Sequence, residues 1–196
     1  MTIEWLSAHY IEVLGAILGI IYIFFSIRQN ILTWPTGLLT SLLYVFVFFQ
    51  SKFYADMGLN VYYVGISLYG WYYWLRGGKR NSKAELPIQK AGLKKIFYLI
   101  PITIIIYGVI LFVLLNYTDS PIPYMDSMTT ALSIVATWML ARKIIEHWII
   151  WIFVDLFSTG LYIYKGLWPT TILFLVYTVM AIIGFIQWRK KLARND

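Results

Sequence analysis

One carboxylate in this chain falls inside a long apolar run. Asp155 lies eight residues after His147 in the stretch HWIIWIFVDLFSTGLYIY. On a helix rising about 1.5 Å per residue, it is roughly 12 Å from the start of the run, too deep for a short side chain to reach the membrane surface. A carboxylate at such depth is costly and by default marks a functional site. The chemistry it offers is the neutralisation of a cation.

The other polar and aromatic residues of this run share a face with Asp155. At 100° per residue, the following residues fall with it in an arc of about 100°: Trp148, Trp151, Ser158, Thr159 and Tyr162. Indole faces attract cations and stack on flat rings. No Lys or Arg falls at membrane depth, so the counter-charge is expected from outside the protein. We therefore predict a small aromatic cation as substrate.

An offset of 114 residues superimposes landmarks of the two ends of the chain, which predicts an internal repeat. The matched pairs are Arg28 and Arg142, Trp34 and Trp148, Tyr63 and Tyr177, Gly70 and Gly184, and Trp74 and Trp188. The repeat counterpart of the Asp155 face is a second face that carries Trp34, Gly37, Ser41 and Tyr44, with Thr40 beside it. Two such faces would line one cavity, to which Asn60, Tyr63, Ser127 and Ser133 would add polar groups.

Ten residues are therefore the candidate substrate-binding set: Asp155, Trp151, Trp148, Asn60, Thr40, Trp34, Tyr44, Tyr63, Ser158 and Tyr162. Simpler interpretations stay open for some of them. Trp148 also suits an interfacial aromatic belt, to which we assign Trp71, Tyr72, Tyr73, Trp74 and Trp188. Ser158 and Thr159 also suit hydrogen bonds within their own helix or to a neighbouring helix.

The composition predicts the elements that carry these residues. Of 196 residues, 60% are hydrophobic and 13% charged, and the mean hydropathy is +0.71. Long apolar runs recur near the length that crosses a bilayer as a helix. We predict an all-α integral membrane protein with seven transmembrane helices at about 9–27, 33–50, 56–75, 97–116, 124–141, 147–165 and 167–188.

Basic residues predict the orientation of these spans. Fourteen of the 16 Lys and Arg residues fall on one side, and only Lys52 and Lys165 fall on the other. Positive charge concentrates in the cytoplasm, so the N-terminus is expected outside and the C-terminus inside. The net charge of +7 then reflects basic cytoplasmic loops and not a nucleic-acid partner.

The repeat predicts a three-part organisation. Residues 1–75 form a first three-helix repeat, 76–116 a basic cytoplasmic loop and a linker helix, and 117–196 a second repeat with a basic tail. Two parallel three-helix bundles joined by one inverting helix are a transporter architecture. The chain has no cysteine and only two histidines, far apart, so neither a metal nor a cofactor is expected.

Two stretches resemble the PnuC family of vitamin transporters. They run from Trp34 to Trp74 and from Asp126 to Ser158, and their most specific pieces are YGWYYW, DS followed by LSIVA and RK, and E-x-W-x-x-W. The resemblance implies two three-helix bundles, similar to the SWEET sugar transporters, in a bacterial cytoplasmic membrane. It also implies facilitated diffusion of nicotinamide riboside or a related vitamin, trapping by a cytoplasmic kinase, and a homotrimer.

This chain resembles the riboside branch of the family but differs from it at three positions. That branch has Asn at the positions of Thr40 and Asp155, and often Gln at the position of Asn60. Fewer amides and an added carboxylate favour thiamine, a permanent cation with one hydroxyl. Nicotinamide riboside, itself a cation, remains the alternative, followed by another nucleoside or a flavin.

Two other functional classes fit the sequence less well. In an enzyme, Glu146, His147 and Asp126 would have to converge, but they fall at opposite ends of their spans. A retinal-type receptor needs a lysine deep in the last span, where there is none. Proton-coupled transport, with Asp155 taking up and releasing a proton, is a variant of the transporter interpretation.

Overall fold

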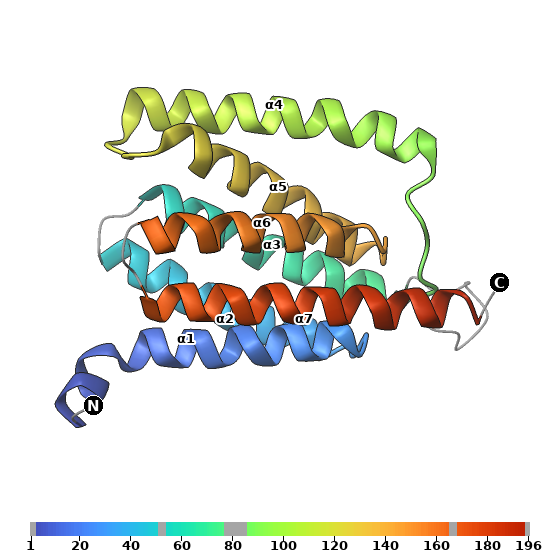
Figure 1. Cartoon of the computed structure of the whole chain (residues 1–196), viewed down its shortest axis with the longest axis horizontal. Helices are drawn as coiled ribbons and strands as arrows, with labels where there is room; N and C mark the ends of the chain where they lie inside the picture. The colour runs from blue at the N-terminus through green and yellow to red at the C-terminus, as the bar shows by residue number, and fades with distance from the viewer. Residues whose placement is uncertain (1–2, 51–53, 77–85, 165–167, 195–196) are drawn as a thin grey trace.

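The computed structural model describes residues 3–50, 54–76, 86–164 and 168–194 of the chain (Figure 1). These residues form helices and contain no strand. The helices are α1 (Ile3–Ile27), α2 (Thr33–Gln50), α3 (Tyr54–Arg76), α4 (Leu93–Tyr117), α5 (Pro123–Ala141), α6 (His147–Tyr164) and α7 (Trp168–Leu192). The predicted all-helical class and the order of seven helices are confirmed.

Helix ends follow the prediction where a polar turn or a proline interrupts the chain. The second predicted span, 33–50, has the bounds of α2, and α5 begins at Pro123, whose missing N–H costs nothing at a first helical position. Other helices extend further, and α4 begins at Leu93 where the prediction has 97. Several basic residues used for orientation lie outside the described residues, namely Lys52, Lys79, Arg80, Lys83 and Lys165.

Helices α1 to α3 are here called the first set and α5 to α7 the second set, and two helix pairs connect the sets. Within the sets, α2 packs against α1 and α3, and α6 packs against α5 and α7. Between the sets, α1 packs against α7 and α3 against α5. The remaining helix, α4, packs against α5 at the edge of the bundle (Figure 1).

The helices differ in how apolar they are. By length and hydropathy, three described helical segments suffice to cross a membrane: Leu93–Tyr117, His147–Tyr164 and Thr170–Leu192. A shorter apolar segment covers Leu14–Ile27. Helices α2, α3 and α5 carry many Ser, Thr, Tyr, Trp and Gly residues, which lowers their mean hydropathy. Polar side chains of this kind are typical of membrane helices that pack against one another.

Two tryptophans that are 114 residues apart make equivalent contacts. Trp34 is fully buried over Gly70, and Trp148 is 3% exposed over Gly184. A Cβ atom at either glycine would lie closer to the indole than the 3.0 Å that real Cβ atoms keep. Each glycine therefore provides the space for the large ring of a neighbouring helix.

A second pair of tryptophans joins the two sets of helices. Trp74 Nε1 donates to the Ala141 carbonyl over 3.1 Å, and Trp188 Nε1 donates to the Ile27 carbonyl over 3.1 Å. Trp74 is 9% exposed and Trp188 is fully buried. The prediction that these two residues belong to an interfacial belt is therefore wrong, because their indole N–H groups satisfy carbonyls at the ends of buried helices.

The turns that follow α1 and α5 also correspond. Gln29 and Lys143 have φ values of 55° and 50°, in the left-handed region that non-glycine residues seldom adopt. The Lys143 ammonium donates to Gln29 Oε1 over 3.3 Å and lies 4.5 Å from the centre of the Trp74 ring. These contacts tie the two turns to each other at the basic end of the bundle.

A short extended segment, residues 86–92, leads into α4 and packs on the turn between α5 and α6. Gln89 forms a parallel β-bridge with Ile144, and the Ala91 N–H donates to Glu146 Oε2 over 2.8 Å. Leu86 and Ile88 are each 6% exposed and belong to the buried core. The part of the basic loop that the structure describes is thus packed against the second set of helices.

Candidate functional site

Asp155 is buried between helices of both sets. Its side chain is 5% exposed on α6. It interacts electrostatically with Tyr63 on α3 and with Tyr177 on α7. Burying a carboxylate is costly unless polar groups or a counter-charge compensate it. The arrangement brings one negative group and two phenol hydroxyls, from three helices, into one interior region.

The two tyrosines beside Asp155 have different partners. The hydroxyl of Tyr63 is hydrogen-bonded to that of Ser133 on α5. Tyr177 interacts electrostatically with Tyr44 on α2. Hydroxyl groups from four helices other than α6 therefore surround the carboxylate region, and each can act as a hydrogen-bond donor or acceptor.

The rest of the predicted face on α6 is mostly buried. Trp151 is half-buried, and Ser158 is 8% exposed. Thr159 donates to the Asp155 carbonyl over 2.8 Å, so its hydroxyl bonds to its own helix. The Tyr162 ring lies 5.0 Å from that of Phe174 on α7. Trp151 and Ser158, one turn to either side of Asp155, are thus the members of this face best placed to contact a bound ring.

On α2, hydroxyl groups also bond within the helix. Thr40 donates to the Thr36 carbonyl over 2.9 Å, and Ser41 donates to that of Gly37 over 2.8 Å. Intrahelical bonds of this kind are common for Ser and Thr. Of the candidate residues on α2, Tyr44 alone interacts with the tyrosines beside Asp155, through Tyr177.

The three remaining candidate residues are Asn60, Trp34 and Trp148. Asn60 is half-buried on α3. Trp34 and Trp148 belong to the buried cluster at the basic end. The ring centroids of Trp34 and Trp74 are 5.4 Å apart in an edge-on arrangement, and those of Trp148 and Trp188 are 5.8 Å apart. Trp148 is seven residues from Asp155, which is about 10 Å along a helix. Both tryptophans therefore pack the end of the bundle above the carboxylate.

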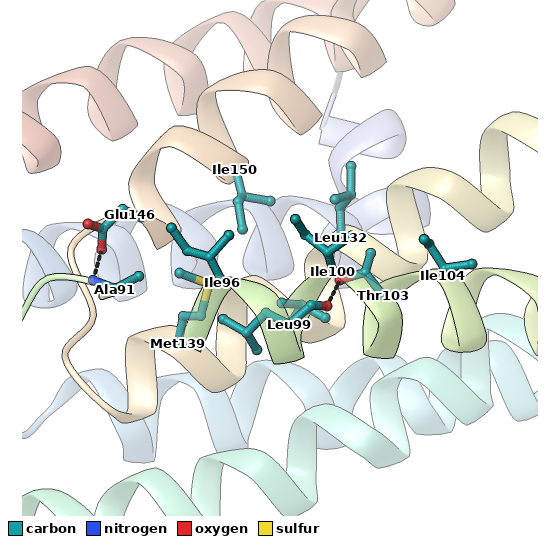
Figure 2. Close-up of a pocket in the computed structure, with 11 residues that line it drawn as sticks. Ala91, Ile96, Leu99, Ile100, Thr103, Ile104, Leu132, Met139, Glu146 and Ile150 are labelled. Carbon is teal, nitrogen blue, oxygen red and sulfur yellow. Dashed lines mark hydrogen bonds between the residues drawn. The ribbon is translucent and has the colours of Figure 1, made fainter. Parts of the chain in front are cut away.

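A hollow of about 320 Å³ lies elsewhere, between α4, α5 and α6 (Figure 2). Its lining is almost wholly apolar and includes Leu99, Ile100, Leu132 and Met139. Glu146, at its edge, accepts the Ala91 N–H. Residues that contact Asp155 are absent from this lining, so the hollow is a surface feature separate from the carboxylate region.

The described residues contain no group of three or more His, Cys, Asp or Glu side chains that could hold a metal ion. What the Asp155 region offers is one carboxylate, several hydroxyls and aromatic walls. Such a region suits reversible binding of a flat cation, through charge, stacking and hydrogen bonds.

Comparison with known proteins identifies the family of the chain. The family model described as nicotinamide mononucleotide transporter matches residues 9–190. The chain belongs to the PnuC family. It is 25% identical to the nicotinamide riboside transporter PnuC of Escherichia coli over 203 residues, which cover 91% of this chain and 84% of that protein.

A second transporter and a solved structure are also similar to this chain. The riboflavin/roseoflavin transporter RibM of Streptomyces davaonensis is 25% identical over 188 residues, covering 94% of this chain and 87% of that protein. The crystal structure of the vitamin B3 transporter PnuC has the same fold, with a TM-score of 0.77, 22% identity, and coverage of 96% of this chain and 84% of that one. These relatives are named as transporters, which supports a non-enzymatic role for an integral membrane protein of the PnuC family.

Tyr177, which is not among the ten candidate residues, interacts with Asp155 in this PnuC-family chain. The offset of 114 residues already pairs Tyr177 with Tyr63, which was a candidate. That pairing is the signal in the sequence that points to Tyr177, because transporters built from repeats bind substrate at the interface between the repeats. Ser133 was noted only as an additional polar group, and the structure makes it the partner of Tyr63.

Proposed function

We propose that this chain takes up a small aromatic cationic vitamin, thiamine, across a bacterial cytoplasmic membrane. The observation that carries the proposal is the burial of Asp155 next to Tyr63 and Tyr177. A buried carboxylate needs a positive partner, and a transported cation supplies one each time it binds. The phenol rings and Trp151 would stack on the flat part of the substrate.

The carboxylate discriminates between the vitamins that the family members carry. Thiamine and nicotinamide riboside are cations, whereas riboflavin is neutral and would leave Asp155 without a counter-charge. Thr40 and Asp155 offer fewer amide partners for ribose hydroxyls than two asparagines would, which favours thiamine. Nicotinamide riboside is the alternative supported by the relative from Escherichia coli.

Facilitated diffusion followed by phosphorylation is the transport mode we propose. A carrier that binds its substrate through one carboxylate and hydroxyls needs no energy source of its own to equilibrate it. A cytoplasmic vitamin kinase would then trap the substrate as its phosphate ester. Facilitated diffusion and the kinase are both proposed from the family resemblance.

We further infer that the carrier consists of two parallel three-helix bundles, at residues 1–75 and 117–196, joined through α4. Support comes from the packing, in which α1 against α7 corresponds to α5 against α3. The matched contacts of Trp74 with Ala141 and Trp188 with Ile27 support it as well. Alternating access would be rocking of one bundle against the other around Asp155.

Seven crossings with the N-terminus outside and the C-terminus in the cytoplasm are the topology we propose. Basic residues at the ends of α3 and α7 and in the turn after α5 support this orientation. Assembly as a homotrimer is proposed from the family resemblance alone.

Calorimetric titration of the detergent-purified protein with thiamine and with nicotinamide riboside tests the function. Tight binding of thiamine and weak binding of the riboside is the expected result. Tight binding of the riboside alone would contradict the substrate assignment, and binding of neither cation would contradict the proposed function.

A further inference from the structure

Each third helix of a proposed repeat places a tyrosine against the first helix of the other repeat. Tyr63 on α3 is bonded to Ser133 on α5, and Tyr177 on α7 lies against Gly19 on α1. The offset of 114 residues relates Tyr63 to Tyr177 and Gly19 to Ser133. A tyrosine therefore lies against the first helix of the other repeat in both places. Its partner there is the Ser133 hydroxyl in one case and the Gly19 backbone in the other.

Gly19 leaves room for one atom of Tyr177. A Cβ atom at position 19 would overlap Tyr177 Oη, far inside the 3.0 Å limit, but would lie 3.4 Å from Cζ, an ordinary contact. The hydroxyl oxygen, and not the ring, occupies the space that a side chain would need. Even one methyl group at position 19 must therefore displace this hydroxyl.

The surroundings of Tyr177 limit where its hydroxyl can go. Its ring lies 5.7 Å from that of Phe174, on the same helix. Tyr177 also interacts electrostatically with Tyr44 and Asp155. Displacement of the hydroxyl from α1 toward these two groups would bring it closer to Asp155, where a bound ring would lie.

We propose that Gly19 and Tyr177 set the width of the substrate site opposite Asp155 and so select which ring systems reach the carboxylate. The inference rests on the proposed function, because it concerns the same site. Ser133, at the position equivalent to Gly19, carries a hydroxyl group that is hydrogen-bonded to Tyr63. Positions 19 and 133 therefore differ in what they offer the neighbouring tyrosine hydroxyl, because Ser133 has a hydroxyl group and Gly19 has no side chain. The two sides of the proposed site thus differ in chemistry.

Binding measurements on matched variants test this inference, with thiamine and nicotinamide riboside as probes. In Gly19→Ala, the displaced hydroxyl is expected to weaken binding of the preferred cation at least tenfold. Tyr177→Phe removes the overlapping atom, so Gly19→Ala/Tyr177→Phe is expected to bind within threefold of Tyr177→Phe alone. Gly65→Ala, at a position with nothing within 4 Å, is the control and should bind as the wild type does.

Each outcome of this experiment has one meaning. Wild-type affinity in folded Gly19→Ala, or no recovery in the double variant, overturns the inference. Should Gly19→Ala fail to fold, Tyr177→Phe alone, which creates no overlap, is expected to change the ratio of the two dissociation constants at least threefold. An unchanged ratio overturns the inference as well. A wild-type protein that binds neither cation overturns the proposed function itself, which is a separate result.

Discussion

Asp155 supplies the charge on which selection of a cation depends. Asp155→Asn keeps the shape of the side chain and removes its charge. We expect the dissociation constant for the cationic vitamin to rise about ten- to hundredfold, since a lost charge-assisted contact costs about 1.5–3 kcal/mol. Calorimetry measures the affinity and thermal unfolding checks the fold. Unchanged affinity in the folded variant would show that Asp155 is not the counter-charge.

Trp151 is the indole nearest to Asp155 along α6, one turn away. Because it is half-buried, it can present a face to a ring bound at the carboxylate. Trp151→Ala is expected to weaken binding about tenfold, as the loss of stacking and cation–π contacts amounts to about 1–2 kcal/mol.

The matched control for Trp151 is Trp168, which is 62% exposed at the start of α7. Trp168→Ala should leave the affinity unchanged. Equal losses in both variants would place the ring of the substrate elsewhere. Trp188→Ala is unsuitable as a control, because its fully buried indole also holds the Ile27 carbonyl.

At the scale of elements, glycines determine how closely neighbouring helices approach. Gly70→Ala and Gly184→Ala would each push a methyl group into a buried indole, Trp34 or Trp148. We expect each variant to lose about 1–3 kcal/mol of stability, as is typical of overpacking. Thermal or denaturant unfolding in detergent measures this loss.

Gly65 on α3 provides the comparison within the same helix as Gly70. A Cβ atom there meets nothing within 4 Å, and alanine favours the helix by up to about 1 kcal/mol. Gly65→Ala is therefore expected to be neutral or slightly stabilising. Equal destabilisation by Gly65→Ala and Gly70→Ala would mean that the close Trp34 contact does not limit the packing of α2 on α3.

The hydrogen bonds at the basic end hold the two sets of helices together there, so opening of this end must break them. In Trp74→Phe/Trp188→Phe a smaller aromatic ring stays at each position, but both indole N–H donors are lost. At about 0.5–1.5 kcal/mol for each bond, the open population should rise roughly tenfold. The natural absence of cysteine allows a single reporter thiol to be introduced at the buried Ser67.

Labelling of Ser67→Cys by a water-soluble maleimide is expected to be faster in the double tryptophan variant. The exposed position Lys190, at the same end, gives the control Lys190→Cys, whose labelling rate should not change. If Ser67→Cys reacts at the same rate with and without the two indole donors, these bonds do not keep the basic end closed.

Local signals in the sequence predicted most of the helix bounds, but they could not identify the contacts between helices. Depth in an apolar run was enough to single out Asp155, and prolines and polar turns placed α2 and α5. By contrast, Trp74 and Trp188 sit near helix ends, where an aromatic belt is the usual interpretation. Their burial depends on carbonyls of Ala141 and Ile27 in the other set of helices, which no local pattern reveals.

At the scale of the whole molecule, the two sets of helices correspond in packing but differ in chemistry. Ser41 stands where the other set has Asp155, and Gly19 stands where it has Ser133. In the proposed pair of repeats, the charge therefore comes from one side only. A site with this asymmetry can orient a substrate that has distinct ends.

A carrier that moves a cation by facilitated diffusion transfers one net charge per cycle, provided that Asp155 has the same protonation state on the loaded and on the empty carrier. The membrane potential therefore acts on uptake, by about 2.3 kcal/mol per 100 mV for one charge. In proteoliposomes, we expect an inside-negative potential of about 100 mV to raise the accumulation ratio roughly 50-fold, and a pH gradient alone to drive none.

Exchange of the cation for a proton on Asp155 would give the opposite pattern. One positive charge would enter and another would leave in each cycle, so uptake would not depend on the membrane potential. An acidic interior would then drive accumulation, because protons would leave as the cation enters. Uptake of radiolabelled thiamine under an imposed potassium potential, and separately under an imposed pH gradient, distinguishes the two. Accumulation driven by pH but not by potential would mean that Asp155 carries a proton outward on the empty carrier.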